Sequence, residues 1–97
     1  MVLANLPERR RNAGCAVVDG VLYHFGGWSN SDLASGYSYS SGQWTAMADM
    51  VVALSGFAYG ADPPRDRIVV THGSNSDTDR RTVYVYSVSQ NVWNAAA

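Results

Sequence analysis

The side chains best suited to recognition chemistry in this sequence are arginines, which supply all seven basic residues. Arg9, Arg10 and Arg11 are adjacent, and Arg80 and Arg81 are adjacent within a polar, charged stretch. A guanidinium group forms forked hydrogen bonds with carboxylates, so either group could bind an acidic partner. A short run of arginines is more often a solvated surface, and that alternative stays open.

Groups that could act in catalysis or bind a metal are few and scattered. His24 and His72 have no cysteine or carboxylate cluster at ligand spacing, so we predict no metal site. Cys15 lies in an apolar segment and is expected in the core, where burial raises a thiol pKa. Aspartates fall at predicted hairpin turns, where they bond the local backbone: Asp19, Asp62 and Asp66. We therefore predict no catalytic residue, no cofactor and no enzyme activity.

Length and charge favour some classes of protein over others. The 97 residues suffice for one domain with a modest core, and the net charge of −1 gives no support to a nucleic-acid or membrane partner. No apolar run approaches the roughly 18 residues needed to cross a bilayer, and the single cysteine cannot form an internal disulfide. Residues 1–11 lack the pattern of a secretory signal. We therefore predict an intracellular, cytoplasmic protein.

The segments that position these residues have strand character. Residues 21–27, Val-Leu-Tyr-His-Phe-Gly-Gly, run from β-forming side chains into two glycines. Paired glycines let the backbone adopt positive φ or pass close to a neighbour. Asp19-Gly20 is a strong two-residue hairpin signal, so residues 13–18 are expected to pair with the strand that follows. Small and β-branched residues at 13–18 suggest a strand buried on both faces.

Two more short strands complete a first unit, and the same order then recurs. Tyr37 and Tyr39 alternate with serines, and residues 43–46 form a strand around Trp44. Residues 47–52 join the units, and a helix there is conceivable although the segment is short and uncapped. The second unit is expected to contain a turn at 60–65, strands at 67–71 and 82–87, and a last strand with Trp93.

The landmarks of the two halves repeat at a common interval. Tyr37 and Tyr86 are 49 residues apart, and so are Trp44 and Trp93. Repeats near 50 residues built from four short strands are typical of propeller blades. We therefore divide the chain into two units, residues 1–50 and 51–97.

These landmarks resemble the kelch family, and the resemblance covers nearly the whole chain as two repeats. In the first repeat, the family's diglycine, tyrosine and tryptophan match Gly26-Gly27, Tyr37 and Trp44. Arg11 stands at the position of the family's arginine before the first strand. The resemblance implies an all-β fold made of two consecutive four-stranded antiparallel blades of a kelch-type β-propeller.

The second repeat is a degenerate copy of the first. It keeps Gly73, Tyr86 and Trp93, but Ala53 occupies the arginine position and His72 replaces the first glycine. In both copies tyrosine precedes tryptophan by seven residues.

The resemblance also implies a protein–protein interaction module or scaffold. Family members recognise partners with the loops between the second and third strands and with the linkers between blades. The residues expected to bind a protein partner are Trp28, Asn30, Ser74, Asn75, Arg80 and Arg81, with Arg10 from the arginine run. Other possibilities are a propeller enzyme or carbohydrate-binding propeller with its site at the central channel, and a structural subunit of a larger complex.

Two blades leave an apolar face uncovered at either end of the stack. Repeat architectures need about three or more units for stability, and large uncovered apolar patches mark interaction sites. We therefore expect the chain either to form a homo-oligomer that completes a propeller or to be part of a larger assembly.

Overall fold

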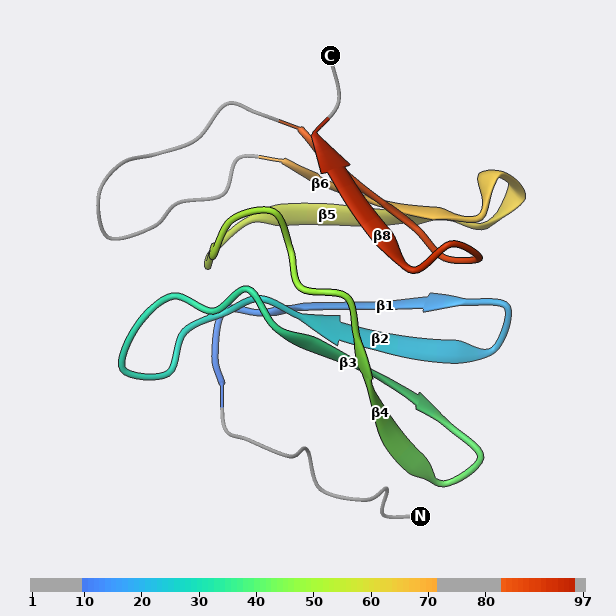
Figure 1. Ribbon diagram of the computed structural model, residues 1–97, viewed down its shortest axis with the longest axis horizontal. Helices are drawn as coiled ribbons and strands as arrows, with labels where there is room; N and C mark the ends of the chain where they lie inside the picture. Colours follow the sequence, from blue (N-terminus) through green and yellow to red (C-terminus); the bar gives the residue numbers. More distant parts are fainter. Residues whose placement is uncertain (1–9, 72–82, 96–97) are drawn as a thin grey trace.

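The computed structural model describes residues 10–71 and 83–95 of the protein. These residues form two four-stranded antiparallel sheets that stack in two layers (Figure 1). The first sheet contains β1 (Gly14–Val18), β2 (Val21–Phe25), β3 (Gly36–Ser40) and β4 (Gln43–Met47). The second contains β5 (Ala58–Asp62), β6 (Arg67–Thr71), β7 (Tyr84–Ser87) and β8 (Val92–Ala95).

Within the described ranges the only helix is a 3-10 turn, Pro63–Arg65. The strands of each sheet follow one another in chain order. The predicted fold class, all-β with two consecutive four-stranded antiparallel sheets, is therefore confirmed. The predicted limits of the two units, 1–50 and 51–97, remain predictions.

Tight turns set the register of the first sheet. Asp19 and Gly20 have φ values of 52° and 80°, and Ser41 and Gly42 have values of 54° and 83°. Two consecutive residues at positive φ are the hallmark of the type I′ turn, whose twist matches that of the strands it joins. The predicted hairpin at Asp19-Gly20 is confirmed, and a second turn of the same kind joins β3 to β4.

The side chains of β1 correct one prediction. Gly14, Ala16 and Val18 are buried, whereas Cys15 and Val17 are exposed. The expectations of a strand buried on both faces and of Cys15 in the core were wrong, because the second sheet covers only one face of the first. The partial burial that Cys15 retains still raises the pKa of its thiol.

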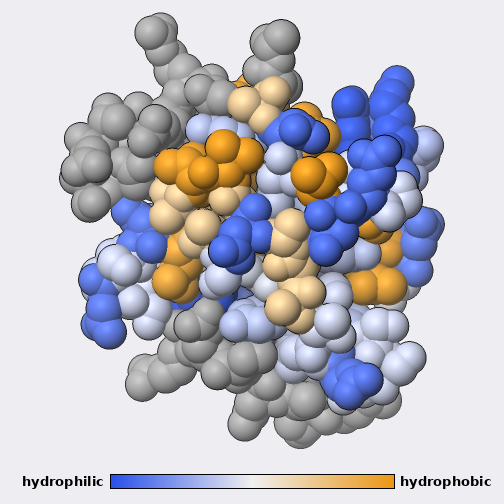
Figure 2. Space-filling view, in the orientation of Figure 1, coloured by the Kyte–Doolittle hydropathy of each residue, from blue (hydrophilic) through white to orange (hydrophobic). Residues whose placement is uncertain are grey.

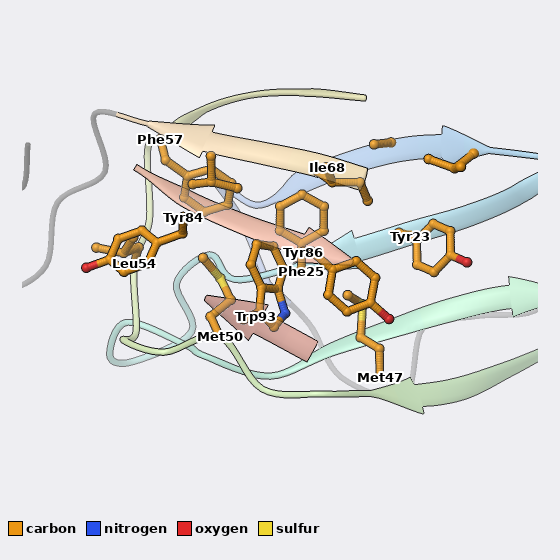
Figure 3. Close-up of a cluster of buried hydrophobic side chains, with 13 residues drawn as sticks. Tyr23, Phe25, Met47, Met50, Leu54, Phe57, Ile68, Tyr84, Tyr86 and Trp93 are labelled. Atoms are coloured by element: carbon orange, nitrogen blue, oxygen red, sulfur yellow. The ribbon is translucent and has the colours of Figure 1, made fainter. Parts of the chain in front are cut away.

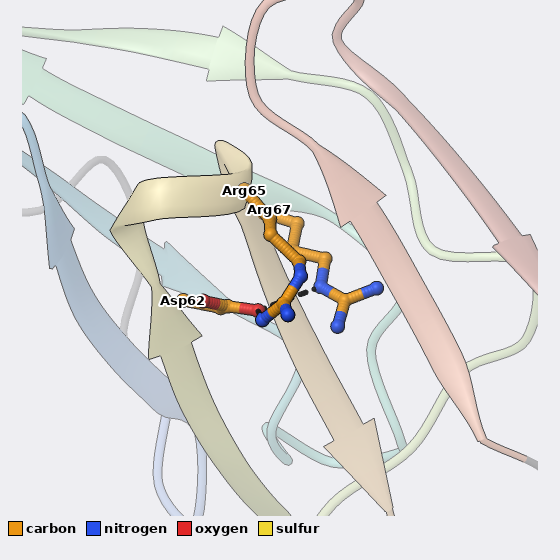
Figure 4. Close-up of polar contacts among 3 residues, drawn as sticks. All are labelled: Asp62, Arg65 and Arg67. Carbon is orange, nitrogen blue, oxygen red and sulfur yellow. Dashed lines mark hydrogen bonds and ion pairs between the residues drawn. The ribbon is translucent and has the colours of Figure 1, made fainter.

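The hairpin of the second sheet also differs from expectation. Residues 60–62, expected in a turn, belong to β5, and the turn itself is the 3-10 segment closed by Asp66 at a φ of 56°. Proline fixes φ and lacks an N–H donor, so the extended strand ends where Pro63 begins. Asp62 accepts hydrogen bonds from Arg67 at 2.9 Å and Arg65 at 3.2 Å (Figure 4), and these hold the pKa of its carboxyl below the ordinary value.

The core lies between the two sheets and is centred on Phe25 (Figure 3). The Phe25 ring is fully buried and stacks on Phe57, with centroids 5.7 Å apart and an interplanar angle of 13°. It also lies 5.4 Å from the Trp93 ring. Glycines pair with Phe25 from both neighbouring strands: a Cβ on Gly14 would overlap its ring, and one on Gly36 would lie 2.9 Å from its Cβ.

Hydrogen bonds join the start of the linker after β4 to β8 and to the turn that precedes β8. The Trp93 indole N–H donates to the Ala48 carbonyl at 3.1 Å. The Asn91 side-chain oxygen accepts from the Ala48 N–H at 2.8 Å and from the Tyr86 hydroxyl at 2.7 Å. These bonds satisfy the polar atoms of two buried aromatic residues while fixing the linker against the sheet.

The register between strands changes which tyrosines are equivalent. Tyr86 lies opposite Trp93 on β8, whereas the residue opposite Trp44 on β4 is Tyr39. The hairpin after β7 has four loop residues and the one after β3 has two, so equal spacing in sequence does not give equal places in the sheets. Tyr39 rather than Tyr37 therefore occupies the place of Tyr86.

The edge of the two-layer stack has a mixed surface. On the face seen in Figure 2, hydrophobic residues lie in separate patches among hydrophilic ones. Scattered apolar residues are normal on a protein surface. The faces that bear on function are therefore the broad sides of the two sheets and the ends of their strands.

Replacing Phe25 by alanine is expected to lower the free energy of unfolding by about 3–5 kcal/mol, because it leaves a cavity in the closest-packed part of the core. Urea unfolding followed by tryptophan fluorescence measures the change, and Phe25→Leu should cost a smaller part of it. Val17→Ala is the control, since Val17 is 55% exposed. Equal losses in Phe25→Ala and Val17→Ala would contradict this assignment of the core.

Tyr86 is expected to make stability fall at high pH. Burial, with contributions from Tyr23 and Asp66, raises the pKa of Tyr86 to about 12. The folded state therefore keeps a proton that the unfolded state loses near pH 10, so stability is complete below that pH and declines up to about 12.

Tyr86→Phe should reduce this alkaline loss by about 1–2 kcal/mol, measured by urea unfolding at a series of pH values. Some dependence should remain, because burial also raises the pKa of Tyr23. Identical pH slopes in the two proteins would rule out this role for Tyr86.

Candidate functional site

The candidate site lies where β2 ends, in the loop that leads to β3. Gly26 and Gly27 follow β2 with φ values of 64° and 99°, which favour glycine. A Cβ on Gly27 would lie 2.8 Å from the Arg11 carbonyl, and one on Gly26 would lie 3.1 Å from the Leu54 carbonyl. Both uses expected of the paired glycines, positive φ and close backbone approach, occur in this loop.

Arg10 ties the segment before β1 to this loop. Its guanidinium donates to the Gly26 carbonyl at 2.9 Å, to the Ser35 carbonyl at 2.7 Å and to the Ser35 hydroxyl at 3.0 Å. The same group lies 5.5 Å from the centre of the Tyr37 ring. Arg10 therefore connects the segment before β1 to the diglycine, and the match of Arg11 to the family's arginine stays a prediction.

Arg11 has a different environment. It is exposed, and its guanidinium lies over the Trp28 indole, 4.5 Å from the ring centre. The backbones of the two residues exchange two hydrogen bonds, at 3.0 and 2.8 Å. No ion pair joins Arg11 to an acidic side chain in residues 10–71 and 83–95. The structure therefore presents an arginine stacked on a tryptophan at the surface.

A pocket of about 500 Å³ opens beside this pair. It is lined by Arg10, Arg11, Trp28, Ser29 and Asn30. The structure thus brings together three residues that were predicted to bind a partner, namely Arg10, Trp28 and Asn30. The sequence offered Arg11 as one of three adjacent arginines that could bind an acidic partner, but named only Arg10 of them as a binding residue. It did not single out Ser29, which carries no signal beyond its place in the loop.

The linker between the sheets holds the loop in place. The Gly27 N–H donates to the Leu54 carbonyl at 2.8 Å, and the Leu54 N–H donates to the Leu33 carbonyl at 3.2 Å. The Ser55 hydroxyl donates to an Asp32 carboxylate oxygen at 2.7 Å. The loop between β2 and β3 and the inter-sheet linker therefore lie together, as seen at the left of Figure 1.

His24 lies on the outward side of β2, away from the pocket. Its ring meets Trp44 edge to face at a centroid distance of 6.5 Å, and its Nε2 finds no hydrogen-bond partner among the described residues. Burial and the nearby Arg10 charge lower the pKa of His24, which favours the neutral ring. In the part of the chain that the structure describes, no three His, Cys, Asp or Glu side chains group together to hold a metal ion.

The remaining predicted site residues fall into two groups. Tyr37 and Trp44 lie on the outward face of the first sheet, and Tyr86 and Trp93 lie buried between the sheets. The others lie outside the described residues: Ser74, Asn75, Arg80 and Arg81 with the neighbouring His72 and Gly73. Their roles stay predictions.

Comparison with known proteins supplies the family. Residues 9–51 match the family model of the Kelch motif. Residues 9–51 are therefore similar to the Kelch motif. This match confirms the kelch resemblance for the four strands of the first sheet, and the two stacked four-stranded antiparallel sheets are consistent with kelch blades of a β-propeller. A comparison with curated proteins found no significant match.

The kelch motif carries only a general functional meaning. Kelch repeats are typically interaction modules without enzyme activity, and the motif by itself names neither a partner nor a binding residue. A helix long and apolar enough to cross a membrane is missing from the part of the chain that the structure covers.

Arg10 is expected to stabilise the fold. Arg10→Ala removes three hydrogen bonds from a charged donor to half-buried acceptors, so it should lower the free energy of unfolding by about 1.5–3 kcal/mol. Arg10→Lys should recover only part of the loss, because an ammonium group cannot reproduce the planar fork. Urea unfolding measures both, with exposed Arg11→Ala as the control. A larger loss in Arg11→Ala than in Arg10→Ala would reverse the roles of the two arginines.

Proposed function

We propose that this protein is an interaction module with two surfaces. The outward face of the first sheet associates with a further β-sheet, and the loop end that contains the pocket recognises a protein partner. The observation that carries the proposal is the outward face of the first sheet. The residue types on this face, taken strand by strand, are similar to those on the face of the second sheet that packs against the first.

The repetition is visible in the cross-strand rows. In the second sheet, the row next to the first hairpin is Ala61–Ile68–Tyr86–Trp93. Ile68, Tyr86 and Trp93 are buried against the first sheet, whereas Ala61 at the edge is exposed. In the first sheet, the row at the same place is Val17–Leu22–Tyr39–Trp44, and it points outward. The Tyr–Trp centroid distance is 5.0 Å in the inward row and 4.9 Å in the outward row. A surface of similar composition is covered in the second sheet, whereas no sheet among the described residues covers it in the first.

The adjacent rows agree as well. The next row of the second sheet is Tyr59–Val70–Tyr84–Ala95, in which Val70 and Tyr84 are buried and the two edge residues are exposed. The corresponding row of the first sheet, Cys15–His24–Tyr37–Ala46, lies on its outward face. Val17 and Cys15 are exposed there, while Leu22, Tyr37 and Tyr39 are half-buried. Exposed apolar surface of this kind marks interaction sites.

The chemistry of the other broad face favours a foreign occupant over a copy of this chain. On the outward side of the second sheet, Asp62 and Arg67 form an ion pair at the place where the first sheet presents Val18 and Val21 to the core. Burying that pair against Leu22 and its neighbours would carry a desolvation penalty. The occupant that fits best is an apolar sheet face from another polypeptide, and a homo-oligomer is the alternative that the experiment separates.

The loop end supports the second half of the proposal. Trp28 and Asn30 line the pocket, and backbone bonds to the linker hold their loop in place. Loops on a rigid scaffold are where binding residues concentrate, and Trp and Arg are common interface anchors. Ser74, Asn75, Arg80 and Arg81 belong to this proposal through the sequence alone. The enzyme and purely structural hypotheses have no specific observation in their favour.

Charging the outward face should abolish association without unfolding the protein. The unaltered protein is expected to bind a hydrophobic dye or to exceed the monomer mass in light scattering. Val17→Glu combined with Leu22→Glu should remove both signals and leave the unfolding midpoint nearly unchanged.

Val92→Glu, on the outward face of the second sheet, is the matched control. A monomer that binds the dye indicates that the occupant is another polypeptide. Oligomers that Val92→Glu abolishes as fully as the first variant indicate copies stacked head to tail, and oligomers that it leaves intact indicate that the first-sheet faces of two copies pair with each other. A monomer that binds no dye would contradict the proposal that this face associates with another sheet.

A further inference from the structure

We infer that the pocket beside β1 and the β2–β3 loop binds the carboxylate of an acidic peptide segment, with Arg11 as the residue that receives it. The inference deepens the loop half of the proposed function and rests on it. It names the chemical class of the ligand, which neither the kelch motif nor the fold supplies.

The described residues that line the pocket carry positive charge. Two of the five lining residues are arginines, and none of the five is acidic. The nearest acidic residue in the loop, Asp32, accepts a hydrogen bond from Ser55 on the linker. An anionic group that enters the pocket therefore meets the exposed Arg11 guanidinium and no acidic side chain among the described lining residues.

The two arginines of the pocket have different roles. Arg10 directs its donors to the Gly26 and Ser35 backbone and to the Ser35 hydroxyl, so it contributes charge and rigidity. Arg11 is exposed, and the central carbon of its guanidinium lies over the Trp28 ring. Its side chain forms no hydrogen bond or ion pair within the described residues, and the planar fork of a guanidinium matches the two oxygens of a carboxylate.

The Arg11–Trp28 pair is also held in place before any ligand arrives. Two mutual backbone hydrogen bonds join the residues, and Trp28 forms a further bridge with Asp32. Beside it, Ser29 N–H bonds to the Ser31 carbonyl at 2.9 Å, and Asn30 occupies the left-handed region with φ 69°. Binding to such a site loses little conformational entropy, which favours specificity for a short charged segment.

The test uses the full chain and a capped peptide that contains two adjacent glutamates, followed by NMR chemical shifts of the Trp28 indole N–H. Saturable shifts are expected with this peptide, and a matched peptide with glutamines should bind at least about tenfold more weakly, because an Arg–carboxylate pair is worth roughly that factor. Inorganic phosphate and a short oligonucleotide are the comparison probes.

Variants locate the contact. Arg11→Gln should weaken glutamate-peptide binding about tenfold, and Arg11→Lys should fall between it and the unaltered protein, because charge remains but the fork is lost. Arg65→Gln is the control: it removes the same charge from the 3-10 turn, whose residues do not line the pocket, and should leave binding unchanged.

The results that overturn the inference are distinct from those that overturn the proposed function. Equal binding of the two peptides, or equal losses in Arg11→Gln and Arg65→Gln, would show only non-specific attraction. Phosphate or oligonucleotide binding at Trp28 as tight as that of the glutamate peptide would also reject a carboxylate site. Each of these outcomes leaves the association of the first sheet's outward face to be judged by its own experiment.

Discussion

The packing of one phenylalanine between two glycines and a second sheet is the constraint on which this structure depends. Phe25 can be fully buried because Gly14 and Gly36, its partners on the flanking strands, have no Cβ to fill the space around it. Its ring then meets Phe57 and Trp93, which the linker and β8 contribute. The second sheet therefore has one favourable position on the first, and the linker must end where the loop after β2 begins.

Much of the local structure follows from the sequence, because it depends on neighbours in the chain. Asp19-Gly20 forms the predicted turn since its φ values are a local property, and β2 has the predicted limits because its apolar run ends in glycines. Cys15 was misplaced for a different reason. Alternation along a strand tells which residues share a face, but whether another layer covers that face is a property of the assembly.

The sequence also could not predict which residues pair across the strands, or which way each arginine side chain points, for a related reason. The tyrosine opposite each tryptophan depends on the number of residues in the intervening turn, so the equal spacing of Tyr37 and Tyr86 from their tryptophans concealed that Tyr39 holds the equivalent place. Three consecutive arginines likewise look alike in a sequence. Only the fold decides that Arg10 turns towards the Gly26 carbonyl while Arg11 lies on Trp28.

The same two arginines connect the stability of the fold to its capacity for recognition. Adjacent residues in extended chain point to opposite sides, so when Arg10 is drawn to the backbone around the diglycine, its neighbour is directed to the surface beside the loop. Trp28 can support Arg11 there because the linker, bonded at Gly27 and Leu33, keeps the loop from collapsing away. The diglycine at the end of β2, which allows close packing, thus also positions the residues of the cationic pocket. Because the carboxylate-accepting edge is positioned by backbone bonds rather than by the ligand, changes to the sheet interface and changes to Arg11 should act independently.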